Sequence, residues 1–247
     1  MSLDLALIGG TGLYQFPALQ DVTRQHVQTP YGNPSSDIVL GRIGSARVAF
    51  LARHGSDHSI LPHRVNYRAN LWALHHLGAQ RVIGVNAVGG IRADLGPRIL
   101  ALPDQIIDYT SGRLGSFCDV EGEAVNHIDF SEPYSAGLRA DLHAAALRAG
   151  VAVLEGGCYG STQGPRLETR AEIERMRRDG CDLVGMTGMP EAALARELDL
   201  DYASICLVAN WAAGCGDSVE ISLAEIFENL EVATAAVPRL IQSLLGG

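Results

Sequence analysis

The sequence contains no lysine. All 19 basic residues among its 247 positions are arginines. Lysine is the residue that forms Schiff bases with carbonyl substrates and pyridoxal cofactors, and it completes the Walker-type phosphate loop. The absence of lysine therefore excludes these three chemistries for the side chains of this chain.

Paired cysteines, a basic leader and long apolar runs are also missing. The cysteines are odd in number and form no C-x-x-C pair, which predicts reduced thiols in a cytoplasmic protein. The first residues, Met1 to Leu7, carry Asp4 and no positive run, so we expect no secretory signal. No stretch approaches the roughly 20 apolar residues that a membrane span needs, so a membrane partner is not expected. The cysteines are Cys118, Cys158, Cys181, Cys206 and Cys215.

Positive charge is in deficit, because 28 acidic residues outnumber the 19 arginines and the formal net charge is -9. An acidic surface argues against nucleic acid as the main partner, although a pocket can still be locally basic and hold a small anion. Hydrophobic residues make up 47% and charged residues 19%, which is typical of a globular protein. The length fits one domain over residues 1–247.

Apolar runs alternate with helical patterns along the chain. The runs are rich in Val, Ile and Leu without strict alternation, as in strands that are covered on both faces. The arrangement predicts an α/β fold with a central mixed sheet flanked by helices. The expected strands are Leu3–Ile8, Asp37–Leu40, Arg47–Leu51, Arg81–Val85, Gln105–Tyr109, Val151–Tyr159, Leu183–Met186 and Tyr202–Val208. The expected helices are Arg64–Leu77, Ser135–Ala149, Glu168–Arg178, Glu191–Glu197 and Leu223–Leu245. The stretch Asp108–Glu132 reads as a long excursion loop.

Small and polar residues follow four of the expected strands. Ligands of open α/β sheets gather at the carboxyl ends of strands, where glycines let backbone N–H groups approach an anion. The four segments therefore predict one shared pocket for an oxyanion and a neighbouring polar ligand. They are Gly9-Gly10-Thr11-Gly12, Arg53-His54-Gly55, Asn86-Ala87-Val88-Gly89-Gly90 and Met186-Thr187-Gly188-Met189-Pro190-Glu191.

Two other readings of these segments are weaker. The dinucleotide fingerprint needs a third glycine where Gln15 stands, so that motif fails. A metal site is conceivable because His54 and His58 are four residues apart, but Arg53 and Arg64 would repel a cation. We predict that the protein binds no metal.

Taken together, these motifs resemble the methylthioadenosine phosphorylase and purine nucleoside phosphorylase family. The resemblance also rests on Thr29-Pro30-Tyr31-Gly32, Val65-Asn66-Tyr67-Arg68-Ala69-Asn70 and Gly164-Pro165-Arg166, so it runs over nearly the whole chain. It implies a nucleoside phosphorylase fold, a homotrimer, and cleavage of a purine nucleoside by inorganic phosphate. Phosphate would be a co-substrate, and no cofactor would be needed.

The resemblance also assigns roles to individual residues. The phosphate contacts would be Thr11, Arg53, His54, Asn86, Ala87 and Thr187. Met186 would lie under the sugar, and the base pocket would hold Leu167, Glu168, Asn210, Trp211 and Ala212. Asn210, His54 and Arg53 would be the catalytic residues.

Two of these residues predict the base. The Asn210 amide can donate to O6 or N7 of a purine, which an ionised aspartate cannot do. Glu168 can accept from a protonated N1, whereas its charge would face the N1 lone pair of adenine. A mismatch of this kind leaves a buried polar group unpaired. The pair therefore favours a 6-oxopurine.

The residues near the sugar's 5′ end predict the rest of the substrate. By the same resemblance, Leu223 and Ile226 face the 5′ group, and His127 reaches a neighbouring subunit. Leu223 and Ile226 are apolar and suit a methylthio group, although an amphipathic helix would also show them. The expected reaction converts S-methyl-5′-thioinosine to hypoxanthine and 5-methylthioribose 1-phosphate.

Four alternatives remain open. The nearest is a purine nucleoside phosphorylase for inosine and guanosine, followed by a methylthioadenosine phosphorylase. A histidine phosphatase would use the Arg53-His54-Gly55 motif, but that motif ends the first strand in such enzymes and follows two earlier strands here. The fourth is a sensor that binds phosphate or nucleoside without turnover.

Overall fold

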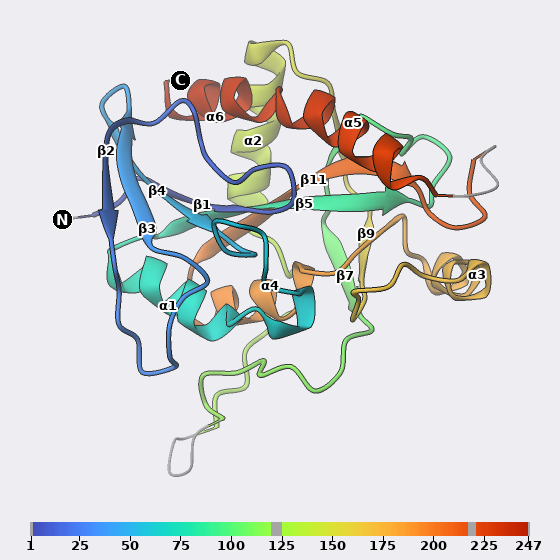
Figure 1. The fold of residues 1–247 in the computed structure, drawn as a ribbon, viewed down its shortest axis with the longest axis horizontal. Coiled ribbons are helices and arrows are strands. Elements are labelled where there is room, and N and C mark those ends of the chain that lie inside the picture. Colours follow the sequence, from blue (N-terminus) through green and yellow to red (C-terminus); the bar gives the residue numbers. More distant parts are fainter. Residues whose placement is uncertain (1, 120–124, 217–220, 247) are drawn as a thin grey trace.

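Three parallel strands form the centre of the molecule. A computed structural model describes residues 2–119, 125–216 and 221–246 (Figure 1). Strand β5 (Arg81–Gly90) lies between β1 (Leu5–Gly9) and β11 (Asp201–Trp211) and pairs in parallel with both. Most residues of the three strands are buried, because helices cover the sheet on both faces.

The remaining strands extend the sheet on both sides of this centre. On one side lie β4 (Ala46–Ala52), β3 (Ile38–Ile43) and β2 (Gln20–Gln25), and on the other lie β10 (Leu183–Gly185), β9 (Cys158–Ser161) and β7 (Gln105–Asp108). A branch from β11 carries β6 (Leu100–Leu102) and β8 (Val153–Glu155). Parallel and antiparallel pairs both occur, which confirms the mixed sheet.

Helices pack on both faces of the sheet (Figure 1). Helices α2 (Ala136–Ala149), α5 (Leu223–Thr234) and α6 (Val237–Leu245) cover one face, and α1 (Tyr67–His76) and α4 (Gly188–Glu197) cover the other. A short 3-10 helix, Pro62–Arg64, precedes α1, and α3 (Arg170–Asp179) lies beyond the β7–β9 side. The expected α/β class with flanking helices is therefore confirmed.

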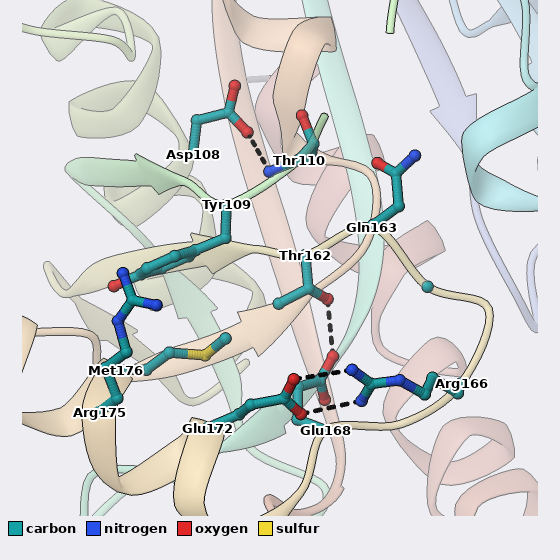
Figure 2. Close-up of a pocket in the computed structure, with 11 residues that line it drawn as sticks. Asp108, Tyr109, Thr110, Thr162, Gln163, Arg166, Glu168, Glu172, Arg175 and Met176 are labelled. Atoms are coloured by element: carbon teal, nitrogen blue, oxygen red, sulfur yellow. Dashed lines mark hydrogen bonds and ion pairs between the residues drawn. The ribbon is translucent and has the colours of Figure 1, made fainter. Parts of the chain in front are cut away.

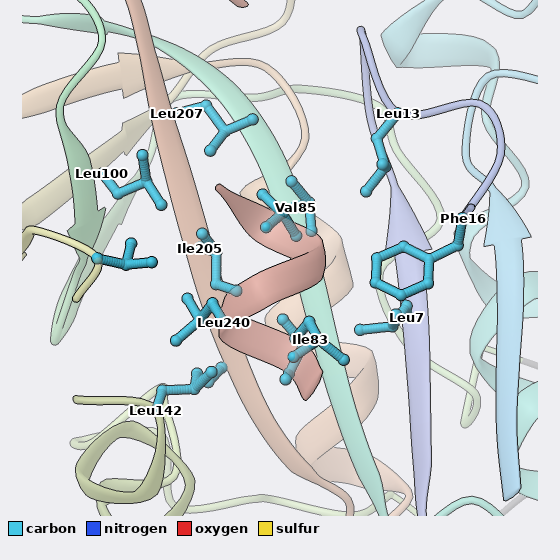
Figure 3. Packing of buried hydrophobic residues seen from close by; sticks show 14 of the residues in the cluster. Leu7, Leu13, Phe16, Ile83, Val85, Leu100, Leu142, Ile205, Leu207 and Leu240 are labelled. Atoms are coloured by element: carbon cyan, nitrogen blue, oxygen red, sulfur yellow. The ribbon is translucent and has the colours of Figure 1, made fainter. Parts of the chain in front are cut away.

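Side chains that alternate along β1 supply both cores. Leu5 and Leu7 belong to the cluster under α2 and α6, whereas Ala6 and Ile8 face α1 and α4. Figure 3 shows the first cluster, in which residues of β1, β5 and β11 meet residues of α2 and α6. The labelled members of these elements are Leu7, Ile83, Val85, Ile205, Leu207, Leu142 and Leu240. This core fixes where the carboxyl ends of the central strands lie.

Two expected elements are each divided in the structure. The strand predicted at Val151–Tyr159 is β8 and β9, because Gly156 and Gly157 between them have φ values of 77° and 116°. The helix predicted at Leu223–Leu245 is α5 and α6. Its break falls before Pro238, which occupies the first turn of α6.

Two strands were not predicted. All six residues of β2 are exposed, so it has no hydrophobic pattern, and β6 has only three residues. The excursion between β7 and α2 forms no helix or strand over its described residues, and positions 120–124 lie outside them. In the described ranges, no helix has both the length and the apolar content to cross a bilayer.

Candidate active site

The carboxyl ends of β1, β4, β5, β10 and β11 open into one cavity of about 350 Å³. That volume is in the range of small-molecule sites. The cavity brings together most of the residues predicted from the sequence, although they come from distant parts of the chain. Those that line it are Thr11, Arg53, His54, Ala87, Leu167, Glu168, Met186, Thr187, Asn210, Ala212, Leu223 and Ile226.

Three predicted site residues do not line this cavity. Asn86 is buried behind its wall. The Trp211 ring packs over Gly96 and Gly216 and faces a separate depression, so only its main chain is near the expected base pocket. His127 is exposed on the excursion loop and does not reach the cavity of its own chain.

Arg53, which follows β4, is held by a buried ion pair. Its Nε and Nη2 donate to the two carboxylate oxygens of Glu191 at 2.7 and 2.8 Å, and its Nη1 donates to the Val85 carbonyl at 2.8 Å. The Tyr202 hydroxyl donates to the same carboxylate at 2.8 Å. Burial opposes the charge on Arg53, but Glu191 outweighs it and the pKa of Arg53 lies above its ordinary value. Arg53 is thus charged and fixed in orientation, with few N–H groups left for a ligand.

Glycine is required where this ion pair approaches the backbone. A Cβ atom on Gly10 would lie 2.8 Å from Nη1 of Arg53 and 2.6 Å from the Val85 carbonyl. The glycine turn after β1 therefore leaves room for the Arg53 side chain to pack against the backbone. It would also let an anion approach the backbone.

His54 is neutral and has one defined tautomer. Its Nδ1 lies 2.8 Å from the Ile60 carbonyl, which can only accept, so Nδ1 carries the proton and Nε2 has a lone pair. Burial, together with the charge of Arg53, lowers the pKa of His54 to about 4. At neutral pH, Nε2 can accept a hydrogen bond from a protonated oxygen of phosphate.

Thr187 belongs to a chain of hydrogen bonds that leads away from the cavity. Its hydroxyl donates to Oδ1 of Asn86 at 2.8 Å, and Nδ2 of Asn86 donates to the Ser204 hydroxyl at 2.6 Å. Thr187 lines the cavity, whereas Asn86 and Ser204 are almost fully buried. Asn86 therefore contacts the site through Thr187.

Glu168 and Asn210, the two residues predicted to contact the base, both line the cavity. Nδ2 of Asn210 donates to the Trp211 carbonyl at 2.6 Å. The Thr162 hydroxyl donates to Oε1 of Glu168 at 2.7 Å, and Figure 2 shows this bond from a neighbouring pocket of about 600 Å³ that Glu168 also lines. Thr162 directly follows β9 and was not predicted. The sequence signal was a hydroxyl residue six positions before Glu168.

Arg113, a residue of the excursion loop, holds the main chain around Met186, which lines the cavity. Met186 packs against Gly164, where a Cβ atom would lie 2.4 Å from the Met186 sulfur. Arg113 donates to the carbonyls of Met186 at 2.9 Å and Met189 at 2.6 Å, and also to those of Thr162 and Gln163. The sequence analysis predicted the excursion loop Asp108–Glu132 but not a role for Arg113, which is the one arginine in that stretch of sequence.

Apolar side chains of α5 also line the cavity. Leu223, Ile226 and Phe227 line it, and Leu223 and Phe227 are 67% and 56% exposed. Large apolar side chains that remain this exposed at a cavity mouth are suited to contact an apolar group of a ligand.

Two histidines of the cavity lie close together. The rings of His54 and His58 are 5.0 Å apart, and Nδ1 of His54 donates to the Ile60 carbonyl. Over the part of the chain that the structure describes, no group of three or more His, Cys, Asp or Glu residues is arranged to hold a metal.

Comparisons with known proteins identify the family of the chain. The family model described as "Phosphorylase superfamily" matches residues 4–246. A probable S-methyl-5′-thioinosine phosphorylase of Xanthomonas campestris pv. campestris is 58% identical over 100% of this chain and 98% of its own. A 6-oxopurine nucleoside phosphorylase of Pyrococcus furiosus is 43% identical over 96% of this chain and 90% of its own.

Solved structures show the same fold. The methylthioadenosine phosphorylase from an antarctic soil metagenomic library has a TM-score of 0.92 at 36% identity, covering 99% of this chain and 86% of its own. The methylthioadenosine phosphorylase of Schistosoma mansoni, in complex with adenine, has a TM-score of 0.93 at 30% identity, covering 99% and 91%. The chain therefore belongs to the phosphorylase superfamily.

Proposed function

We propose that the protein catalyses the phosphorolysis of S-methyl-5′-thioinosine to hypoxanthine and 5-methylthioribose 1-phosphate. The observation that carries the proposal is that Asn210 and Glu168 line the same cavity as Thr11, Arg53 and Thr187. The full-length similarity to probable S-methyl-5′-thioinosine phosphorylases supports it.

Phosphate is the nucleophile in this reaction. One of its oxygens forms a bond to C1′ while the C1′–N9 bond breaks, and the electron pair of that bond stays on the base. The hydroxyls of Thr11 and Thr187 and the remaining N–H groups of Arg53 hold the phosphate. Nε2 of His54 accepts from the protonated phosphate oxygen, so that an unprotonated oxygen faces C1′.

The base end stabilises the leaving purine. As negative charge grows on the ring, a hydrogen bond from Asn210 to O6 or N7 strengthens, so it favours the transition state over the ground state. Glu168 accepts from N1–H and fixes the orientation of the ring. For this contact Asn210 exchanges its present bond to the Trp211 carbonyl for one to the base.

The methylthio group occupies the apolar end beside Leu223, Ile226 and Phe227. Burying a methylthio group there removes apolar surface from water on both sides of the contact. A 5′-hydroxyl would meet no polar partner among these three side chains, which favours the methylthio nucleoside over inosine.

The reaction uses inorganic phosphate as co-substrate and requires no cofactor or metal. We also propose a cytoplasmic homotrimer, in which His127 reaches the cavity of a neighbouring subunit. No disulfide joins the five cysteines, as expected in a reducing compartment. Sedimentation velocity of the purified protein measures the oligomeric state.

A phosphorolysis panel tests the proposed function. Methylthioinosine, methylthioadenosine, inosine, guanosine and adenosine are compared at saturating phosphate, with release of free base followed by absorbance. We expect the highest kcat/KM for methylthioinosine and no base release without phosphate. A preference for methylthioadenosine would overturn the assignment of Asn210 and Glu168.

The second candidate is a phosphorylase of inosine and guanosine, which the similarity to 6-oxopurine nucleoside phosphorylases favours. It shares the base contacts and differs only at the 5′ end. Equal or higher kcat/KM for inosine in the same panel would select it.

A further inference from the structure

Thr187 lines the cavity, but its hydroxyl proton is directed at a buried side chain behind it. It donates to Oδ1 of Asn86 at 2.8 Å. The amide of Asn86 in turn donates to Ser204 at 2.6 Å, and the Ser204 hydroxyl lies 3.4 Å from the sulfur of Cys206. The four side chains form one buried chain of hydrogen bonds that ends at the cavity.

This arrangement gives an unprotonated phosphate oxygen no donor from Thr187. An unprotonated phosphate oxygen only accepts hydrogen bonds, so Thr187 has to give it the single proton that it now gives to Asn86. Once that proton has turned, two acceptors, Oδ1 of Asn86 and Oγ1 of Thr187, would face each other. An unmade bond between buried polar atoms costs free energy.

We propose that Asn86 and Ser204 are positioning residues of the phosphate site, which act through Thr187 by reversal of this hydrogen-bond chain. The inference rests on the proposed function, since it takes Thr187 as a phosphate contact. When phosphate binds, the Asn86 amide rotates by half a turn. Its NH2 group then donates to Thr187, the Thr187 hydroxyl donates to phosphate, and the Ser204 hydroxyl donates to Oδ1 of Asn86.

The inner end of the chain permits both directions. Burial raises the pKa of the Cys206 thiol to about 12, so the thiol keeps its proton at neutral pH. It can accept from Ser204 in the present direction and donate to Ser204 in the reversed one, because either atom of this pair can be the donor. Thr187, Asn86, Ser204 and Cys206 therefore each have a partner within the chain in both directions. The reversed direction gives up one longer bond, which Nδ2 of Asn86 now donates to the Gly84 carbonyl at 3.5 Å.

The position of Asn86 separates this proposal from a direct phosphate contact. The residue is 1% exposed and does not line the cavity, whereas its neighbour Ala87 does. The described bonds of the Asn86 amide go to Thr187, Ser204 and the Gly84 carbonyl, and of these partners Thr187 is the one that lines the cavity. Removal of the Thr187 hydroxyl should therefore make both Asn86 and Ser204 irrelevant to phosphate binding.

A double-mutant cycle tests that consequence. Ser204→Ala is made in the natural chain and in a Thr187→Val background, and the KM values for phosphate and methylthioinosine are measured for all four proteins. We expect Ser204→Ala alone to raise the phosphate KM about 3- to 10-fold with the nucleoside KM unchanged. In the Thr187→Val background it should change the phosphate KM less than about 1.5-fold, since the residue through which Ser204 acts is gone.

Equal effects of Ser204→Ala in the two backgrounds would overturn the relay, and so would an unchanged phosphate KM in the single variant. If Ser204→Ala does not fold, Asn86→Ala in the same two backgrounds is read in the same way. A crystal structure with phosphate gives an independent result: Asn86 bonded directly to phosphate contradicts the proposal. Should the natural chain release no base from any purine nucleoside in the presence of phosphate, the proposed function fails instead.

Discussion

Replacing Asn210 by aspartate should reverse the preference of the site for the base. The amide NH2 of Asn210 now donates to the Trp211 carbonyl and is the donor available to O6 or N7 of a 6-oxopurine. Aspartate has no donor, so two acceptors would face each other, and a second carboxylate would join Glu168 in the cavity. For adenine, the same carboxylate can accept from the N6 amine.

The magnitude follows from the loss of one bond that strengthens in the transition state. An unpaired polar group or a lost bond to a charged partner costs about 1.5–3 kcal/mol, which is about 10- to 150-fold in kcat/KM at 1.36 kcal/mol for each factor of ten. We expect kcat/KM for methylthioinosine to fall by that factor in Asn210→Asp. The value for methylthioadenosine should hold or rise.

The assay measures kcat/KM for both nucleosides at saturating phosphate, and the quantity of interest is their ratio. Asn33→Asp is a matched control, because it makes the same chemical change at an exposed position outside the cavity. The control should leave the ratio as in the natural chain. An unchanged ratio in Asn210→Asp would refute the role of Asn210 in base recognition.

Three further predictions concern stability and positioning. Thr162→Val removes the hydroxyl that donates to Glu168, so kcat/KM for methylthioinosine should fall about 3- to 10-fold and Thr162→Ser should restore it; equal losses in both variants would contradict this role. Arg53→Ala should raise the phosphate KM and, because Glu191 loses its buried partner, lower the free energy of unfolding in urea by about 3–5 kcal/mol; a stable variant would argue against the ion pair. His54 has a pKa of about 4 in the folded protein against about 6.5 when unfolded, so the unfolded chain binds more protons between these values. Stability should therefore fall by up to about 3 kcal/mol as the pH drops from 6.5 to 4, and His54→Gln should lose less over the same window.

The sequence predicted the centre of the fold because its strands are buried on both faces. Runs such as those of β1 and β11 are apolar without alternation, and glycines or polar residues mark where they end. The exposed strand β2 carries no such pattern, since its pairing with β3 depends on the sheet beside it. The local sequence pattern therefore identifies strands that are buried, and it misses exposed strands that form only by hydrogen bonding to a neighbouring strand.

The same limit applies to the candidate site. Strand-end motifs placed Arg53, His54 and Thr187 at one cavity, because parallel strands bring their carboxyl ends together. Residue type did not reveal that Asn86 lies behind that cavity or that the Trp211 ring turns away from it. Adjacent residues on a strand point to opposite faces, and only the packing decides which face belongs to the site.

The least predictable feature is the charge of the phosphate end. Arg53 suggested a cationic site, but Glu191 lies 138 positions later in the sequence and neutralises it, and His54 has no charge. Phosphate would therefore be held by oriented hydroxyl and N–H donors more than by net positive charge. That balance suits the proposed chemistry. Positive charge develops on the sugar in the transition state, and the negative charge of phosphate stabilises it. A strongly cationic site would cancel much of that negative charge. Oriented hydroxyl and N–H dipoles bind the phosphate and leave its attraction to the sugar largely intact.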